Sequence, residues 1–155
     1  MSGFATGFLE GRSGEAAELA RLHAEEWQRL YRGWNEQTAL AEFGAQKTDG
    51  SLPTTLVLRD GKQIIGSVSI VDDDCEARRD LNPWLASLYV MPGQRGRGHG
   101  SRLIAAALDL AERNDVEFLH VFTESSKRIF QKHGFLPLAD AVTNNRPVAI
   151  LRRKI

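Results

Sequence analysis

One cysteine, Cys75, is present among the 155 residues, and no apolar run approaches the length needed to cross a membrane. A single thiol cannot form an internal disulfide, and it makes a structural zinc site built from cysteines implausible. The four histidines and the cysteine also lack metal-ligand spacing, so we expect no metal site. The N-terminus lacks a basic region followed by an apolar core, which a signal peptide requires. We therefore expect a cytoplasmic protein.

An excess of charge of one sign is also lacking. Twenty Lys and Arg residues balance twenty Asp and Glu residues, which gives a formal net charge of zero. Without a strong overall field, neither nucleic acid nor a membrane surface is an expected partner. The chain is long enough to bury a sizeable core, and no repeat or low-complexity linker divides it. We interpret it as a single domain spanning residues 1–155.

Apolar periodicity and turn residues predict a mixture of strands and helices. Apolar residues recur at helical spacing from Ala16 to Tyr31, after a capping residue at Ser13. Asp60-Gly61 is a hairpin signal. The predicted strands are 4–9, 54–59, 64–71, 84–90, 116–122, 136–141 and 147–151, and the predicted helices are 13–33, 35–44, 102–114 and 125–133. This order, βααβββαβαββ, indicates an α+β fold in which helices flank a mixed sheet.

A glycine-rich stretch, 94–101, lies between a predicted strand and a predicted helix. Three glycines at alternate positions leave the backbone free to adopt positive φ and to expose its N–H groups where the helix begins. Exposed amides, backed by the positive end of the helix dipole, form an anion site suited to a phosphate. The stretch has neither the Walker pattern nor G-x-G-x-x-G. A plain connecting turn and a nucleotide site are the alternatives to a coenzyme site.

The same stretch reads R-x-x-G-x-G, with Arg95, Gly98 and Gly100 at the fixed positions, and it resembles the phosphate loop of the GNAT superfamily of N-acetyltransferases. The resemblance covers nearly the whole chain and implies the GNAT fold, a mostly antiparallel mixed sheet of about seven strands with about four helices. It implies acetyl-CoA as cosubstrate, with the pyrophosphate in the loop and the pantetheine arm along the fourth strand. It also implies a possible homodimer. The implied coenzyme contacts here are Leu88, Tyr89, Val90, Arg95, Gly96, Arg97, Gly98, His99, Gly100 and Ser101.

A second segment extends the resemblance. GNAT proteins commonly carry N-x-x-A-x-x-x-Y-x-x-x-G-F after the fifth strand, and here Gly134 and Phe135 match its end. Thr123 stands where Asn bonds the pantetheine arm and Ser126 where Ala is usual, so both are candidate coenzyme contacts. Phe130 replaces the Tyr that usually protonates the departing thiolate, and its ring can pack against the acetyl or pantetheine end. Protonating a thiol of pKa about 8.5 at pH 7 gains only about 2 kcal/mol, so water can replace the acid.

A general base is harder to assign. Some relatives place a Glu early on the fourth strand, where this chain has Trp84. Deprotonating a lysine-like amine of pKa about 10.4 at pH 7 costs about 4–5 kcal/mol, so for such a substrate the base matters more than the acid. Acidic residues before the fourth strand and in the first helix are the candidates, foremost Asp74 and Glu26, acting directly or through a water. As a group, these carboxylates favour a cationic amine.

Backbone and aromatic groups complete the predicted site. A backbone N–H late in the fourth strand, of Tyr89 or Val90, would polarise the thioester carbonyl. Trp27, Tyr31 and Trp84 are predicted to wall the acceptor pocket, where an aromatic face favours an ammonium group. We expect an acetyl-CoA-dependent N-acetyltransferase that moves acetyl directly to an amine of a small molecule, a peptide or a protein. Because the usual Tyr and Glu are missing, a non-catalytic acyl-CoA-binding or sensor domain is the alternative.

Overall fold

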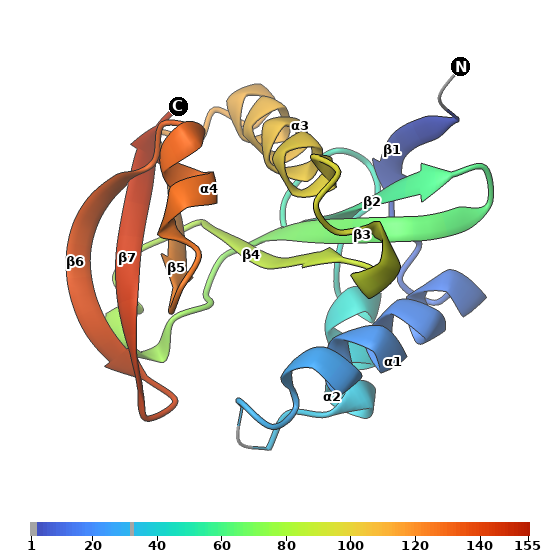
Figure 1. Ribbon diagram of the computed structural model, residues 1–155, viewed down its shortest axis with the longest axis horizontal. Coiled ribbons are helices and arrows are strands. Elements are labelled where there is room, and N and C mark those ends of the chain that lie inside the picture. Colours follow the sequence, from blue (N-terminus) through green and yellow to red (C-terminus); the bar gives the residue numbers. More distant parts are fainter. Residues whose placement is uncertain (1–2, 32) are drawn as a thin grey trace.

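A computed structural model describes residues 3–31 and 33–155, and its strands form one seven-stranded sheet in the order β1-β2-β3-β4-β5-β7-β6 (Figure 1). The strands are β1 (Phe4–Phe8), β2 (Thr54–Asp60), β3 (Gln63–Val71), β4 (Trp84–Val90), β5 (Phe118–Thr123), β6 (Leu136–Thr143) and β7 (Arg146–Lys154). The helices are α1 (Gly14–Trp27), α2 (Glu36–Gly44), α3 (His99–Arg113) and α4 (Lys127–Lys132). Among the strands of these described residues, β4 and β5 alone pair in parallel. The predicted α+β class and element order are confirmed.

Different helices cover the two faces of the sheet. Successive residues of a strand point to opposite faces. Leu56 and Leu58 of β2 accordingly pack in the core that contains Leu103 of α3, on one face. Val57 between them packs in a second core with Leu19 of α1, on the other face, and Figure 1 shows α1 and α2 opposite α3. The sheet is therefore covered by α3 on one face and by α1 and α2 on the other.

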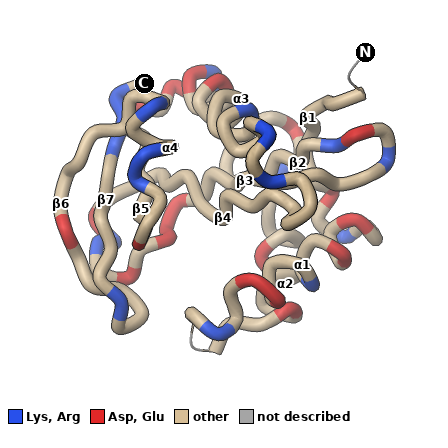
Figure 2. Tube along the Cα trace, in the orientation of Figure 1, with Lys and Arg blue, Asp and Glu red and all other residues tan. Residues whose placement is uncertain are grey.

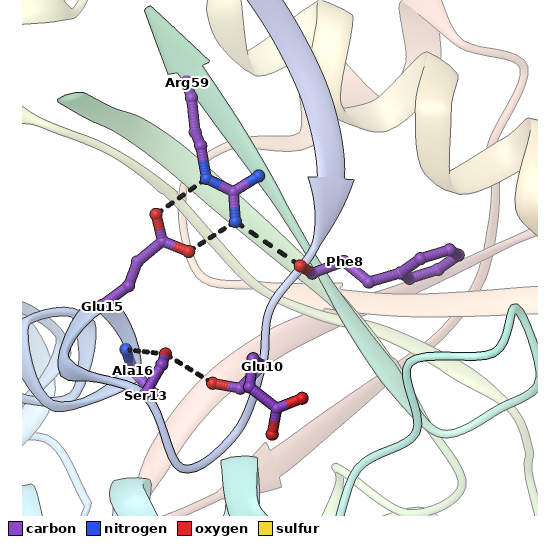
Figure 3. Close-up of polar contacts among 6 residues, drawn as sticks. All are labelled: Phe8, Glu10, Ser13, Glu15, Ala16 and Arg59. Atoms are coloured by element: carbon purple, nitrogen blue, oxygen red, sulfur yellow. Dashed lines mark hydrogen bonds and ion pairs between the residues drawn. The ribbon is translucent and has the colours of Figure 1, made fainter. Parts of the chain in front are cut away.

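A cap and an ion pair fix the start of α1 (Figure 3). The Ser13 hydroxyl accepts a hydrogen bond from the Ala16 N–H at 3.1 Å, as predicted for a capping residue. Arg59 of β2 donates through Nε and Nη2 to both carboxylate oxygens of Glu15, with Nε and Oε2 2.7 Å apart. This half-buried bidentate pair ties the first turn of α1 to the sheet, so the other end of the helix reaches the region beside β4.

The predicted helix 13–33 is wrong at its end, because α1 stops at Trp27. After it, the Leu30 N–H bonds to the Trp27 carbonyl and the Trp34 N–H bonds to the Tyr31 carbonyl, which are tight turns rather than helix. Gly33 adopts φ +76, a conformation that glycine allows at little cost. Arg32, within the predicted helix, lies outside the described residues. Tyr31 therefore projects from a turn and not from the face of α1.

The sheet opens between β4 and β5. Their register pairs only Trp84 with His120. On its other side, β4 carries a bulge against β3, where the pairing shifts between Ser67 and Ser69 and Ser87 takes φ +53. A bulge bends its strand and increases the local twist. The later part of β4 is thereby left with a free edge toward β5, and both large pockets of the described chain lie along it.

Candidate active site

The first pocket, which we call the loop pocket, lies at the N-terminus of α3 and has a volume of about 580 Å³. Gly96 and Gly98 adopt φ +77 and +84, and no side chain caps the helix. The first intrahelical bond of α3 joins the Arg102 N–H to the Gly98 carbonyl, so the N–H groups of 99–101 have no partner within the helix. Its lining includes the predicted residues Leu88, Tyr89, Val90, Arg95, Gly96, Gly98, His99, Gly100 and Ser101. Such a pocket suits a phosphate.

The two arginines of the loop, both predicted as coenzyme contacts, differ in their surroundings. Arg95 donates from Nε to the Val90 carbonyl at 2.8 Å and from Nη2 to Glu26 at 3.2 Å. Its guanidinium therefore joins β4 to the end of α1. Arg97 does not line the loop pocket and instead approaches the Gln94 side chain at 3.4 Å. The guanidinium of Arg95, which lines the loop pocket, is therefore already paired with Glu26.

Two predicted candidates, Tyr89 and Val90, differ in where their backbone N–H groups point. The Met91 N–H bonds to the Ile65 carbonyl of β3 at 2.8 Å, so residues 65 and 91 form a hydrogen-bonded pair. Antiparallel pairs alternate between bonded and non-bonded. The pair of Ser67 with Tyr89 is thus a bonded one, and Val90 faces away from β3. Tyr89 is therefore wrong as an oxyanion donor, and Val90, with Leu88 on the same edge, is the candidate.

The second pocket, which we call the aromatic pocket, has a volume of about 630 Å³. It lies between the end of α1, α2, the segment joining β3 to β4, and the β6–β7 turn. Its lining comprises three kinds of residue: aromatic Trp27, Tyr31, Trp34, Phe122 and Phe130; charged Glu42, Asp73, Asp74, Glu76, Arg79, Glu124 and Arg146; and small, amide or aliphatic Leu30, Leu85, Ala86, Ser87, Leu88, Val121, Thr123, Ser125, Ser126, Thr143, Asn144 and Val148.

Trp84 was predicted to wall the acceptor pocket, and this prediction is wrong. The residue has no exposed surface and packs with Cys75 and Ile150. Its indole N–H donates to the Leu81 carbonyl at 2.7 Å, which satisfies the one polar group of the ring. β4 is buried on both faces at this end, and Trp84 belongs to the small core beneath the pocket. Trp27 and Tyr31 do line the pocket.

Asp74 sits in a concentration of negative charge. The residue is exposed to the water of the pocket, yet protein atoms surround the carboxyl closely. This desolvation, together with the charges of Glu42 and Asp73, raises the pKa of Asp74 to about 7. Burial, with smaller contributions from the charges of Asp74 and Glu124, raises the pKa of Tyr31 to about 12. The carboxyl of Asp74 thus exchanges a proton near neutral pH while the phenol of Tyr31 keeps its own.

The predicted pantetheine contacts gather where the two pockets meet. Thr123 and Ser126 both line the aromatic pocket, and the Ser126 N–H donates to Thr123 Oγ1 at 2.9 Å. Phe130 is buried, and its ring lies 5.8 Å from that of Phe135. Phe130 also lines the aromatic pocket, so its ring faces the place where the resemblance puts a phenol.

A sequence model of the acetyltransferase (GNAT) family matches residues 17–135. The chain belongs to this family. Solved structures of the same fold include the yncA protein of Salmonella typhimurium, described as an acetyltransferase and solved with acetyl-CoA, at TM-score 0.76 and 18% identity over 98% of this chain and 94% of that one. A GNAT acetyltransferase of Elizabethkingia anophelis with acetyl-CoA bound gives TM-score 0.67 and 13% identity, covering 100% of both chains. An IAA acetyltransferase of Bacillus cereus gives 0.66 and 17% over 98% and 99%. A comparison with curated protein sequences finds no match.

The GNAT assignment confirms the fold and the general activity expected from the loop, and this protein is an acetyltransferase by family. Within residues 3–31 and 33–155, no group of three or more His, Cys, Asp and Glu side chains is placed to hold a metal ion. None of the helices in the described part of the chain is long and apolar enough to cross a membrane.

Several residues of this GNAT site escaped sequence reasoning. Glu42 lies on α2, next to the buried Phe43, and nothing in a helical pattern says which side chain of the helix reaches a pocket formed with distant segments of the chain. Thr143, Asn144 and Arg146 enter from the β6–β7 turn, for which the sequence predicted only the two flanking strands, 136–141 and 147–151. Glu26, in contrast, was expected as a base but lines the loop pocket and pairs with Arg95, outside the lining of the aromatic pocket.

Proposed function

We propose that this GNAT protein binds acetyl-CoA in the loop pocket and along β4 and transfers the acetyl group to an amine held in the aromatic pocket. The observation that carries the proposal is the continuity of the two pockets, which share Trp27, Leu88, Ser125 and Ser126 in their linings. Direct transfer between two substrates requires that both lie in one cleft with their reacting atoms adjacent. A phosphate site at one end and a carboxylate-rich site at the other fit an anionic donor and a cationic acceptor.

The chain has the groups that acetyl-CoA requires. The uncapped amides of α3 and the positive φ of Gly96 and Gly98 fit a pyrophosphate. The free edge of β4, with the N–H groups of Leu88 and Val90 facing the cleft, fits the amide-bearing pantetheine arm. Acetyl-CoA supplies an activated thioester. A neutral amine attacks its carbonyl carbon, the new C–N bond forms as the C–S bond breaks, and no acyl-enzyme is needed.

Asp74 is the proposed general base. It lines the aromatic pocket, and its pKa of about 7 leaves a large part of it ionised at neutral pH and still basic enough to take a proton. It acts on the amine directly or through a water. The cleft-facing N–H of Val90 or Leu88 stabilises the developing oxyanion. The departing thiolate takes its proton from water, because the side chain of Phe130 has none to give.

Two measurements test the proposal. Calorimetric titration should give saturable binding of acetyl-CoA, and ATP or NAD should not displace it. Release of free CoA thiol should then follow addition of one class of amine, across a panel that includes alkylamines, diamines, amino acids and lysine peptides. Absence of acetyl-CoA binding would refute the proposal. Binding of acetyl-CoA without turnover of any amine would support an acyl-CoA sensor, which the substitution of Phe for Tyr at position 130 favours. Displacement by ATP would indicate a nucleotide site.

A further inference from the structure

The charges of the aromatic pocket divide into those that are compensated and those that are not. Arg79 lies 3.9 Å from Asp73, and Arg146 lies 2.5 Å from Glu124. Both arginines of the described lining are therefore paired with carboxylates of the same lining. Glu42, Asp74 and Glu76 have no ion-pair partner among the described residues. The described lining thus has three more carboxyl groups than arginines, and no arginine or lysine in it is left over to receive a carboxylate group.

The uncompensated carboxylates come from opposite sides of the pocket. Glu42 is on α2, whereas Asp74 and Glu76 are on the segment between β3 and β4, and Figure 2 shows acidic positions in both places. They are near enough that the charge of Glu42 helps to raise the pKa of Asp74. Carboxylates that face one another across a cavity repel unless a cation lies between them. A ligand with positive charge would relieve that repulsion.

Aromatic and hydroxyl groups complete this cation environment. The Trp34 indole N–H approaches Glu42 at 3.4 Å, and the rings of Trp34 and Tyr31 have centroids 6.3 Å apart. Aromatic faces beside a carboxylate are a recurring setting for ammonium groups. Thr143, only 5% exposed, lines the same pocket, and its hydroxyl lies against the Cys75 thiol. The Cys75 thiol beside it is at most a weak donor.

We propose that the acceptor is a diamine or polyamine, whose reacting nitrogen is served by Asp74 and whose second, protonated nitrogen is held by Glu42 beside the packed rings of Tyr31 and Trp34. This inference rests on the proposed N-acetyl transfer. It adds that the acceptor carries two positive charges before reaction and no carboxylate. A pocket of about 630 Å³ accommodates such a chain within the usual range of ligand sites.

Matched acceptors test the inference. We would compare α,ω-diamines of three to six carbons with n-alkylamines and ω-amino acids of equal length, at pH 8.5, where Asp74 is ionised. We expect kcat/KM to be about 10-fold or more higher for the diamine than for the alkylamine, because the diamine gains one partly shielded ion pair with Glu42. The amino acid should be the poorest acceptor. Glu42→Gln should bring the diamine-to-alkylamine ratio close to one. Glu112→Gln, an exposed residue of α3 outside both pockets, is the control and should preserve the ratio.

A binding measurement separates this inference from the proposed function. In the presence of CoA, the diamine should raise the melting temperature more than the alkylamine does, and Glu42→Gln should remove the difference. If amines turn over without preference for diamines, the inference fails and N-acetyl transfer stands. If diamines bind in this selective way without turnover, the placement of a protonated nitrogen at Glu42 stands, and the proposed transfer to these amines fails. A wild-type preference that survives Glu42→Gln would refute the placement of the second nitrogen.

Discussion

Replacing Asp74 by Asn should remove the part of the pH dependence of kcat/KM that the proposed base contributes. With a pKa of about 7, the carboxyl is half ionised at pH 7 and roughly a tenth ionised at pH 6. A positioned general base contributes about 10²- to 10⁴-fold to the rate. We therefore expect kcat/KM of Asp74→Asn to be about 100-fold or more below the wild-type value at pH 8.

The ratio of the wild-type to the variant kcat/KM is the decisive quantity, because ionisation of the free amine affects both proteins equally and cancels. The ratio should be constant above pH 8 and fall about tenfold per pH unit below pH 7. It would be measured by CoA release between pH 5.5 and 9.5 with one saturating concentration of acetyl-CoA. A ratio that does not change with pH would refute Asp74 as the base.

Asp73→Asn is the matched control for this experiment. The charge of Asp73 helps to raise the pKa of Asp74, so removing that charge should move the inflection of the profile to lower pH and leave its shape intact. Loss of the inflection in Asp73→Asn instead would transfer the role of base to Asp73.

Three further changes have defined outcomes. Burial lowers the pKa of His23 to about 3, so on acidification the unfolded chain binds a proton before the folded protein does. The free energy of unfolding should therefore fall by about 2 kcal/mol from pH 7.5 to pH 5. Urea unfolding of His23→Gln should lack this pH dependence, and an unchanged dependence in the variant would contradict the role of His23. Gly98→Ala forces a side chain into φ +84, which costs about 1–2 kcal/mol, and should lower both thermal stability and acetyl-CoA affinity, whereas Gly93→Ala, with open space around it, should change neither. Glu26→Gln removes an anion beside the phosphate site and should tighten acetyl-CoA binding measured by calorimetry, without altering the pH inflection; if it abolished the inflection, Glu26 would be the base.

Local sequence signals were sufficient wherever one face of an element or one turn decided the structure. Both ends of β4, Trp84 and Val90, were predicted, since prolines at 83 and 92 bound an apolar run. The caps at Ser13 and Asn35 were also predictable, because a cap depends on one local contact. In each, the side-chain oxygen accepts a hydrogen bond from the backbone N–H three residues later. The phosphate loop likewise depends only on glycines and the helix that follows.

Predictions failed where tertiary contacts decide. Apolar spacing continues through Leu30 and Tyr31, yet the chain turns after Trp27 and places Tyr31 against the pocket. Trp84 could not be assigned to core or cleft, since β4 is apolar on both faces there, and contacts with the distant residues Cys75, His120 and Ile150 enclose it. Glu42 could not be found, because its role depends on the distance from α2 to the segment between β3 and β4, which no local pattern encodes.

The departures of this chain from the GNAT pattern differ in their cost to the reaction, and Asp74, the base that we propose, would offset the larger one. Losing the acid at Phe130 forgoes about 2 kcal/mol at pH 7, whereas an alkylamine acceptor needs about 4–5 kcal/mol to become neutral. The family's usual Glu position is occupied by the buried Trp84, but Asp74 follows β3, the strand that pairs with β4, and lines the same cleft. The carboxylates that raise its pKa toward neutrality are also those that attract a cation. In the proposed mechanism, one cluster of charge would both draw the acceptor in and provide the base that deprotonates it, and for that reason a doubly charged amine should be the better substrate.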